Sequence, residues 1–67
     1  MSLDTIIRAA SRRTGHRELL VRAPVEIIAR RHAEGETVQQ IAERLQADLP
    51  GNEVASTDFV GWVIDQL

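Results

Sequence analysis

Apolar residues recur along this chain with the spacing of amphipathic helices, and glycine or proline separates the segments that show it. In residues 3–14 the apolar positions follow the i, i+3, i+4, i+7 rule and form one stripe, which consists of Leu3, Ile6, Ile7 and Ala10. Ser2 offers an N-cap hydroxyl, and Gly15 can adopt the left-handed backbone that ends a helix. The pattern therefore predicts a first helix over residues 3–14.

A second helix is predicted over residues 24–34. Pro24 suits the first turn of a helix, where its missing N–H costs nothing, and it restricts Ala23 before it to an extended backbone. The face expected to be buried consists of Val25, Ile28, Ala29 and His32. Because His32 lies on this apolar face, it is predicted to be a packed, hydrogen-bonded core histidine. The apolar block at residues 19–21 is ambiguous, since one or two helical turns could form there before the proline.

A sharp corner between two helices is predicted at residues 35–37. Gly35 ends the second helix, and Thr37 and Gln40 have the T-x-x-Q spacing of a capping box that starts the next one. The stripe expected to be buried in this third helix consists of Val38, Ile41, Ala42, Leu45 and, at its end, Leu49. Because about two residues join the helices, they must turn sharply against each other.

The sequence PGNE at residues 50–53 is the strongest turn signal in the chain. Ser56 or Thr57 then caps a last helix with a wide apolar face and Trp62 on its shoulder; that face consists of Phe59, Val60, Val63, Ile64 and Leu67. A strand over residues 59–64 is the alternative, because these residues are β-branched and aromatic. The cap favours the helix, and the chain is expected to form one all-α domain over residues 1–67, a small bundle of three to five helices.

The chain has 67 residues and no cysteine, so it can form only one small domain without disulfides. A domain of this size buries only about 60% of the surface of its unfolded chain. Small domains often gain stability by self-association, and a homodimer is therefore expected. Its two histidines are too few for a zinc site without carboxylate ligands, and no cofactor is expected. No apolar run approaches the roughly 20 residues of a membrane span. A cytoplasmic protein with no membrane contact is therefore expected.

Charge is divided unevenly between the two halves of the chain. Residues 1–32 carry seven arginines and three carboxylates, a balance of +4, whereas residues 33–67 carry one arginine and seven carboxylates, a balance of −6. Such a division is typical of contact with nucleic acid or of self-complementary docking, and both interpretations stay open here.

The pattern Gly35-x-Thr37-x-x-x-Ile41-Ala42-x-x-Leu45 resembles the first two helices of a helix-turn-helix domain. It is similar to the three-helix kind found in resolvase-like, sigma-like and many small phage or plasmid regulators, and the resemblance covers residues 24–67. It implies that the helix before Gly35 is a support helix and that the final helix reads DNA.

The sequence departs from the helix-turn-helix pattern in two respects. Ten residues separate Leu45 from Ser56, where the family has a turn of three or four. The outward face of the final helix carries Asp58, Gly61 and Asp65, and aspartates repel DNA phosphates. DNA affinity would then have to come from other parts of the chain.

The candidate phosphate contacts are six arginines on the first two predicted helices and near them: Arg8, Arg12, Arg13, Arg17, Arg30 and Arg31. If the helix that starts at Thr37 enters the groove, the base-reading candidates are Gln39, Gln40 and Arg44. Thr37, Ser56 and Thr57 complete the set of candidate DNA contacts. The alternative for each arginine is a solvated position on a charged face.

Two functions are compatible with these patterns. The first is a DNA-binding transcriptional regulator, a repressor or autoregulator of a phage or mobile-element type, which acts as a homodimer on a palindromic operator in double-stranded DNA. The alternative is a protein-interaction module that docks on or inhibits a partner protein without binding DNA. Its candidate interface residues are Ile27, Phe59 and Trp62. We find no nucleophile–base pair, phosphate loop or metal-ligand spacing, so no enzyme is expected.

Overall fold

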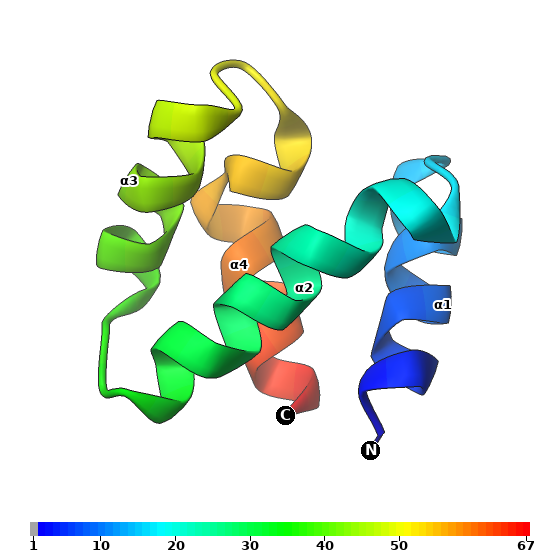
Figure 1. The fold of residues 1–67 in the computed structure, drawn as a ribbon, viewed down its shortest axis with the longest axis horizontal. Coiled ribbons are helices and arrows are strands. Elements are labelled where there is room, and N and C mark those ends of the chain that lie inside the picture. Colours follow the sequence, from blue (N-terminus) through cyan, green and yellow to red (C-terminus); the bar gives the residue numbers. More distant parts are fainter. Residues whose placement is uncertain (1) are drawn as a thin grey trace.

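The computed structural model describes residues 2–67. The helices are α1 (Leu3–Thr14), α2 (Glu18–Ala33), α3 (Val38–Asp48), the short 3-10 helix η1 (Glu53–Ala55) and α4 (Thr57–Gln66). In Figure 1, α2 crosses diagonally in front of α4, with α1 on one side of this pair and α3 on the other. The predicted all-α fold is confirmed as a small bundle. Because residues 59–64 are helical in α4, the strand alternative for them is wrong.

Helix α1 has the predicted bounds and joins the core. The Ser2 hydroxyl accepts a hydrogen bond from the Thr5 N–H at 3.3 Å, and Gly15 ends the helix with φ of 77°. The predicted stripe is buried except at its start, since Leu3 remains 38% exposed. The stripe packs mainly against α2, so the N-terminal segment belongs to the same domain as the rest of the chain.

The second helix begins earlier than predicted, because α2 starts at Glu18 and passes through Pro24 without interruption. The predictions of a start at residue 24 and of an extended Ala23 are therefore wrong. Pro24 removes the N–H that would bond to the carbonyl of Leu20, one turn earlier. Leu20 is 61% exposed at the surface, where water can reach this part of the chain, while the Pro24 ring is buried. Burial of the ring beside Val21 and Val25, both fully buried, offsets the lost hydrogen bond.

His32 is exposed, so its predicted position in the core is wrong. The buried residues of α2 are Val21, Pro24, Val25 and Ile28. The last turn of α2 extends beyond Ile28, the last of these buried residues, and the His32 imidazole on this turn is in contact with solvent. Helical periodicity predicts the face of a residue correctly, but it does not show where the neighbouring helices stop.

The corner between α2 and α3 forms as predicted. Gly35 has φ of 91°, and the N–H of Glu36 after it donates to the carbonyl of Arg31, as in a Schellman motif. The capping box is complete, because the Thr37 hydroxyl accepts from the Gln40 N–H at 3.1 Å and the Gln40 side-chain oxygen accepts from the Thr37 N–H at 2.9 Å. Helix α3 therefore leaves the corner in a fixed direction.

The connection from α3 to α4 contains its own short helix. Asn52 caps η1, since its side-chain oxygen accepts from the Val54 N–H at 3.1 Å. The Ser56 hydroxyl caps α4 by accepting from the Phe59 N–H at 3.1 Å, and it donates to the carbonyl of Glu53 at 2.7 Å. The ten residues between Leu45 and Ser56 thus form the last turn of α3, a glycine turn and η1.

The core lies between all four α-helices and η1. Its buried side chains are Ile6, Ile7, Ala10, Val21, Val25, Ile28, Ile41, Ala42, Leu45, Val54, Ala55, Phe59, Val60 and Val63. Within residues 2–67 every fully buried side chain is hydrophobic. In the same range, each helix is too short or too polar to cross a lipid bilayer.

Candidate nucleic-acid interface

The predicted DNA-contacting arginines fall into two groups according to the elements that carry them. The α1 arginines are Arg8, Arg12, Arg13 and Arg17, on α1 and at the N-cap of α2. The corner arginines are Arg30, Arg31 and Arg44, on α2 and α3. Figure 1 shows α1 and α3 on opposite sides of α2 and α4, so Arg8 and Arg12 start from a helix on the other side of the bundle from the helix that carries Arg44.

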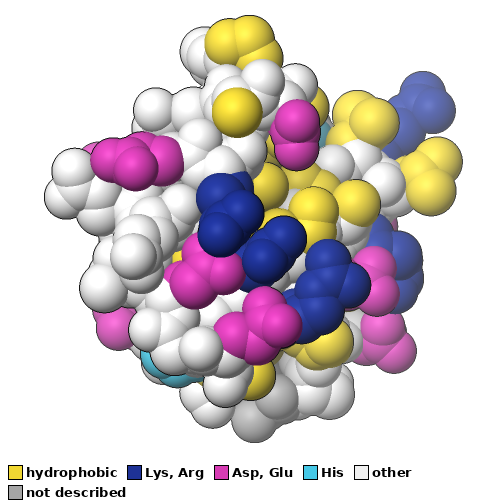
Figure 2. Space-filling view, turned by 60° about the vertical axis from the view of Figure 1, so that its left-hand side comes forward, with side chains coloured by type: hydrophobic (Ala, Val, Ile, Leu, Met, Phe, Trp, Pro, Cys, Tyr) yellow, Lys and Arg dark blue, Asp and Glu magenta, His cyan; other side chains and the backbone are white. Residues whose placement is uncertain are grey.

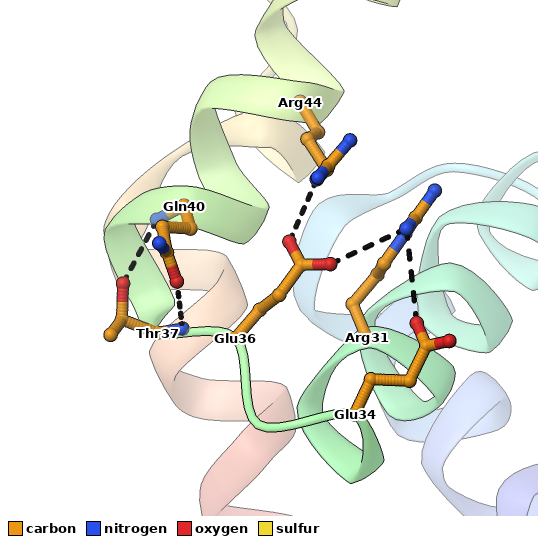
Figure 3. Close-up of polar contacts among 6 residues, drawn as sticks. All are labelled: Arg31, Glu34, Glu36, Thr37, Gln40 and Arg44. Carbon is orange, nitrogen blue, oxygen red and sulfur yellow. Dashed lines mark hydrogen bonds and ion pairs between the residues drawn. The ribbon is translucent and has the colours of Figure 1, made fainter.

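Glu36 bridges two of the corner arginines (Figure 3). One carboxylate oxygen lies 2.7 Å from Nε of Arg44, and the other lies 3.3 Å from Nη1 of Arg31. Glu34 adds a longer contact of 3.8 Å to the same Arg31 nitrogen. The Glu36 side chain is only 17% exposed, but the Arg44 side chain is 57% exposed and that of Arg31 is 34% exposed, so water screens the Arg44 pair more than the Arg31 pair. Arg31 and Arg44 thus share one carboxylate, while the buried Nε of Arg31 has no hydrogen-bond partner among the described residues.

The corner arginines surround a shallow hollow of about 300 Å³ between α2 and α3. Its lining consists of the three arginines with Ile27, Leu45, Ala47 and Asp48. Figure 2 shows arginine side chains in a row across this side of the molecule, with acidic side chains beside them. Ile27 is half-buried and packs on the core, so it faces another element of the same chain. The hollow is electrostatically mixed rather than basic.

The polar residues proposed to read bases are engaged in local contacts. Thr37 and Gln40 bond to each other in the capping box (Figure 3), and Gln39 donates to Glu43 at 3.5 Å. The exposed face of α3 therefore presents a carboxylate beside its amides. Ser56 is likewise used as a cap, which leaves the exposed Thr57 as the free hydroxyl at the start of α4.

Helix α4 presents an acidic surface and one partly exposed aromatic ring. Asp58 and Asp65 are exposed, as the sequence predicted. Phe59 is only 2% exposed in the core of its own chain, which corrects its assignment as an interface residue. Trp62 is half-buried, and the guanidinium of Arg13 lies 5.1 Å from the centre of its ring, which is a cation–π contact between α1 and α4.

Four further exposed arginines form no ion pair with a described residue. Arg8 and Arg12 lie one turn apart on α1, Arg17 lies at the start of α2, and Arg30 lies near its end. Among residues 2–67, no carboxylate lies within ion-pair distance of these four, whereas Arg22 pairs with Asp4 at 3.5 Å. Their positive charge is directed to solvent.

No role was predicted for Glu36 from the sequence. The available signal was its position in a two-residue corner, between a helix that ends with Arg30 and Arg31 and a helix that carries Arg44. A comparison of the chain with protein families, with curated proteins and with solved structures finds no match. The helix-turn-helix resemblance therefore stays a prediction.

Proposed function

We propose that this protein is a small DNA-binding regulator that contacts duplex DNA through the α1 arginines. The observation that supports the proposal is the contrast between Arg8 and Arg12 on α1, which are exposed without a carboxylate partner among the described residues, and Arg31 and Arg44, which share Glu36. Duplex DNA carries one negative charge per about 1.7 Å of its axis. The guanidinium fork matches the geometry of phosphate oxygens, so exposed arginines suit this polyanion.

This mode of contact differs from the one that the helix-turn-helix resemblance implies. The exposed aspartates of α4 would meet phosphates of like charge, so α4 is a poor recognition helix. Contacts from α1 would position the protein on the sugar–phosphate backbone of the DNA. A homodimer would present two such surfaces to the two halves of a palindromic operator. A protein of this kind would act as a repressor or autoregulator of the phage or mobile-element type.

The test is fluorescence anisotropy of a labelled duplex, measured between 50 and about 200 mM salt, where phosphate contacts lose affinity steeply. Arg12→Gln should weaken binding and reduce the slope of log K against log salt by about 1. Arg44→Gln is the matched control, because it removes the same charge from an arginine that is ion-paired with Glu36. Equal losses in the two variants, or an affinity independent of salt, would contradict the α1 surface.

The second candidate function is a protein-interaction module, and the internal pairing of Arg31 and Arg44 with Glu36 favours it. Charges that are paired within the chain add little to DNA affinity. Trp62, half-buried and next to Arg13, would then be the anchor for a partner. Absence of duplex binding at low salt, together with loss of a partner in Trp62→Ala at unchanged far-UV circular dichroism, would favour this function over the first.

A further inference from the structure

Two consecutive leucines in the first turn of α2 are the most exposed large hydrophobic side chains in the described part of the chain. Leu19 is 80% exposed and Leu20 is 61% exposed, compared with 48% for Leu67 and 38% for Leu3. Single exposed leucines are common on protein surfaces, but adjacent ones form a continuous apolar area. Figure 1 shows that the start of α2 forms an outer corner of the molecule, beside the end of α1.

A hollow of about 170 Å³ lies directly beside this leucine pair. Its lining consists of His16, Leu20, Leu49, Asn52 and Val54. Cavities of about 150 Å³ in proteins accept a benzene-sized group, so this hollow has room for a leucine side chain. The surface thus carries a protruding leucine, Leu19, and a receptor for one, side by side.

A protruding group and its receptor on one face make that face complementary to itself. A two-fold axis between two copies brings Leu19 of each copy to the hollow of the other, which is an isologous contact. The charged residues beside the leucines are also complementary to themselves, because Arg17 and Glu18 are exposed neighbours of opposite charge. Neither forms an ion pair with another described residue of its own chain, so each is available to the other copy, and in the dimer Arg17 belongs to the seam while Arg8 and Arg12 remain the phosphate contacts.

We infer that a second copy of this chain docks on the leucine seam, defined by Leu19, Leu20 and the hollow beside them. A standard interface buries about 800 Å² per partner. The whole chain exposes 4226 Å², so such a seam would cover about a fifth of its surface. This inference deepens the homodimer of the proposed function and rests on it, but it can be tested in the absence of DNA.

The experiment is sedimentation equilibrium of the full chain over a concentration range that reaches hundreds of micromolar. The wild-type mass should rise from that of the 7.5 kDa chain to twice that value. Leu19→Ser should weaken dimerisation at least tenfold with unchanged circular dichroism, since this side chain contributes little to its own core. Leu67→Ser is the control, because it removes an exposed leucine away from the seam and should dimerise as the wild type does.

A charge exchange gives a second measurement. Arg17→Glu alone should weaken the dimer, and Arg17→Glu combined with Glu18→Arg should restore it, because the two charges face each other across the axis. A wild type that remains monomeric at every concentration overturns the seam, as does Leu19→Ser that dimerises normally. A monomer that binds duplex DNA through Arg12 overturns the seam alone, whereas a dimer dependent on Leu19 that binds no DNA overturns the DNA surface alone.

Discussion

Glu36→Gln tests how much the bridge between α2 and α3 contributes to stability. The Glu36 carboxylate joins two arginines, but the two contacts differ in their exposure to water. The Arg44 side chain is 57% exposed, so its pair is screened and contributes about 0.5 kcal/mol at most. The Arg31 side chain is 34% exposed, and a charged hydrogen bond in this drier position contributes about 1 kcal/mol. Glutamine keeps the shape and one acceptor oxygen, and we expect a loss of about 1.5 kcal/mol.

This loss is large for a chain of 67 residues, whose total free energy of unfolding is about 3 to 10 kcal/mol. It corresponds to a decrease in Tm of about 6 to 12 °C. The measurement is urea unfolding, followed by far-UV circular dichroism and by the fluorescence of Trp62. Glu43→Gln is the control, because it removes the same charge from an exposed position whose described partner is Gln39 at 3.5 Å. If both variants unfold at the same urea concentration, the bridge does not stabilise the corner.

The same variant also reports on DNA contact. Loss of the Glu36 charge would release Arg31 and Arg44 from their internal partner. Because the proposed DNA surface lies on α1, across the molecule from α3, duplex affinity should change less than about threefold at physiological salt, where charges beyond a Debye length of about 8 Å are screened. A tenfold gain would show instead that the corner arginines touch the phosphates.

Three further substitutions test the elements that build the fold, each by urea unfolding. Thr37→Ala should destabilise the chain by about 1 kcal/mol because it removes the hydroxyl of the capping box, whereas Thr37→Ser should remain near the wild type. Gly35→Ala should cost about 1 to 2 kcal/mol because φ is 91° there; the space around the new methyl is open, so equal stability would exclude the backbone explanation. Ile6→Ala should cost about 2 to 5 kcal/mol because this side chain is fully buried, and a loss below 1 kcal/mol would mean that α1 is not part of the core.

Local signals in the sequence were sufficient for most of the helix boundaries. Ser2, Gly15 and the Thr37–Gln40 pair act on backbone groups within five residues of themselves, so their effect does not depend on the rest of the fold. The amphipathic stripes predicted the centre of the core, since Ile41 and Leu45 are buried as their spacing predicts, but Leu3, His32 and Leu67 at the ends of the stripes are exposed. The all-α class follows from these short-range interactions alone.

The misjudged residues are those whose environment comes from distant segments. Pro24 remains inside α2 because the core around it buries its ring, which an isolated peptide could not do. His32 is exposed because it lies one turn beyond Ile28, the last buried residue of α2. Propensity rules describe the cost of a residue in a helix, but the compensating contacts depend on tertiary packing.

In the candidate site, too, some features follow from the sequence and others only from tertiary packing. The sequence alone shows the residue types and the charge imbalance between the two halves, and these predicted a polyanion or a self-complementary surface as partner. Which arginines are available was decided only when the helices packed, since α2 and α3 bring Glu36 between Arg31 and Arg44 and leave Arg8 and Arg12 in solvent. The exposure of Leu19 has the same origin. Charge and hydrophobicity belong to a residue, but their availability to a partner depends on what the fold places within a few ångströms of them.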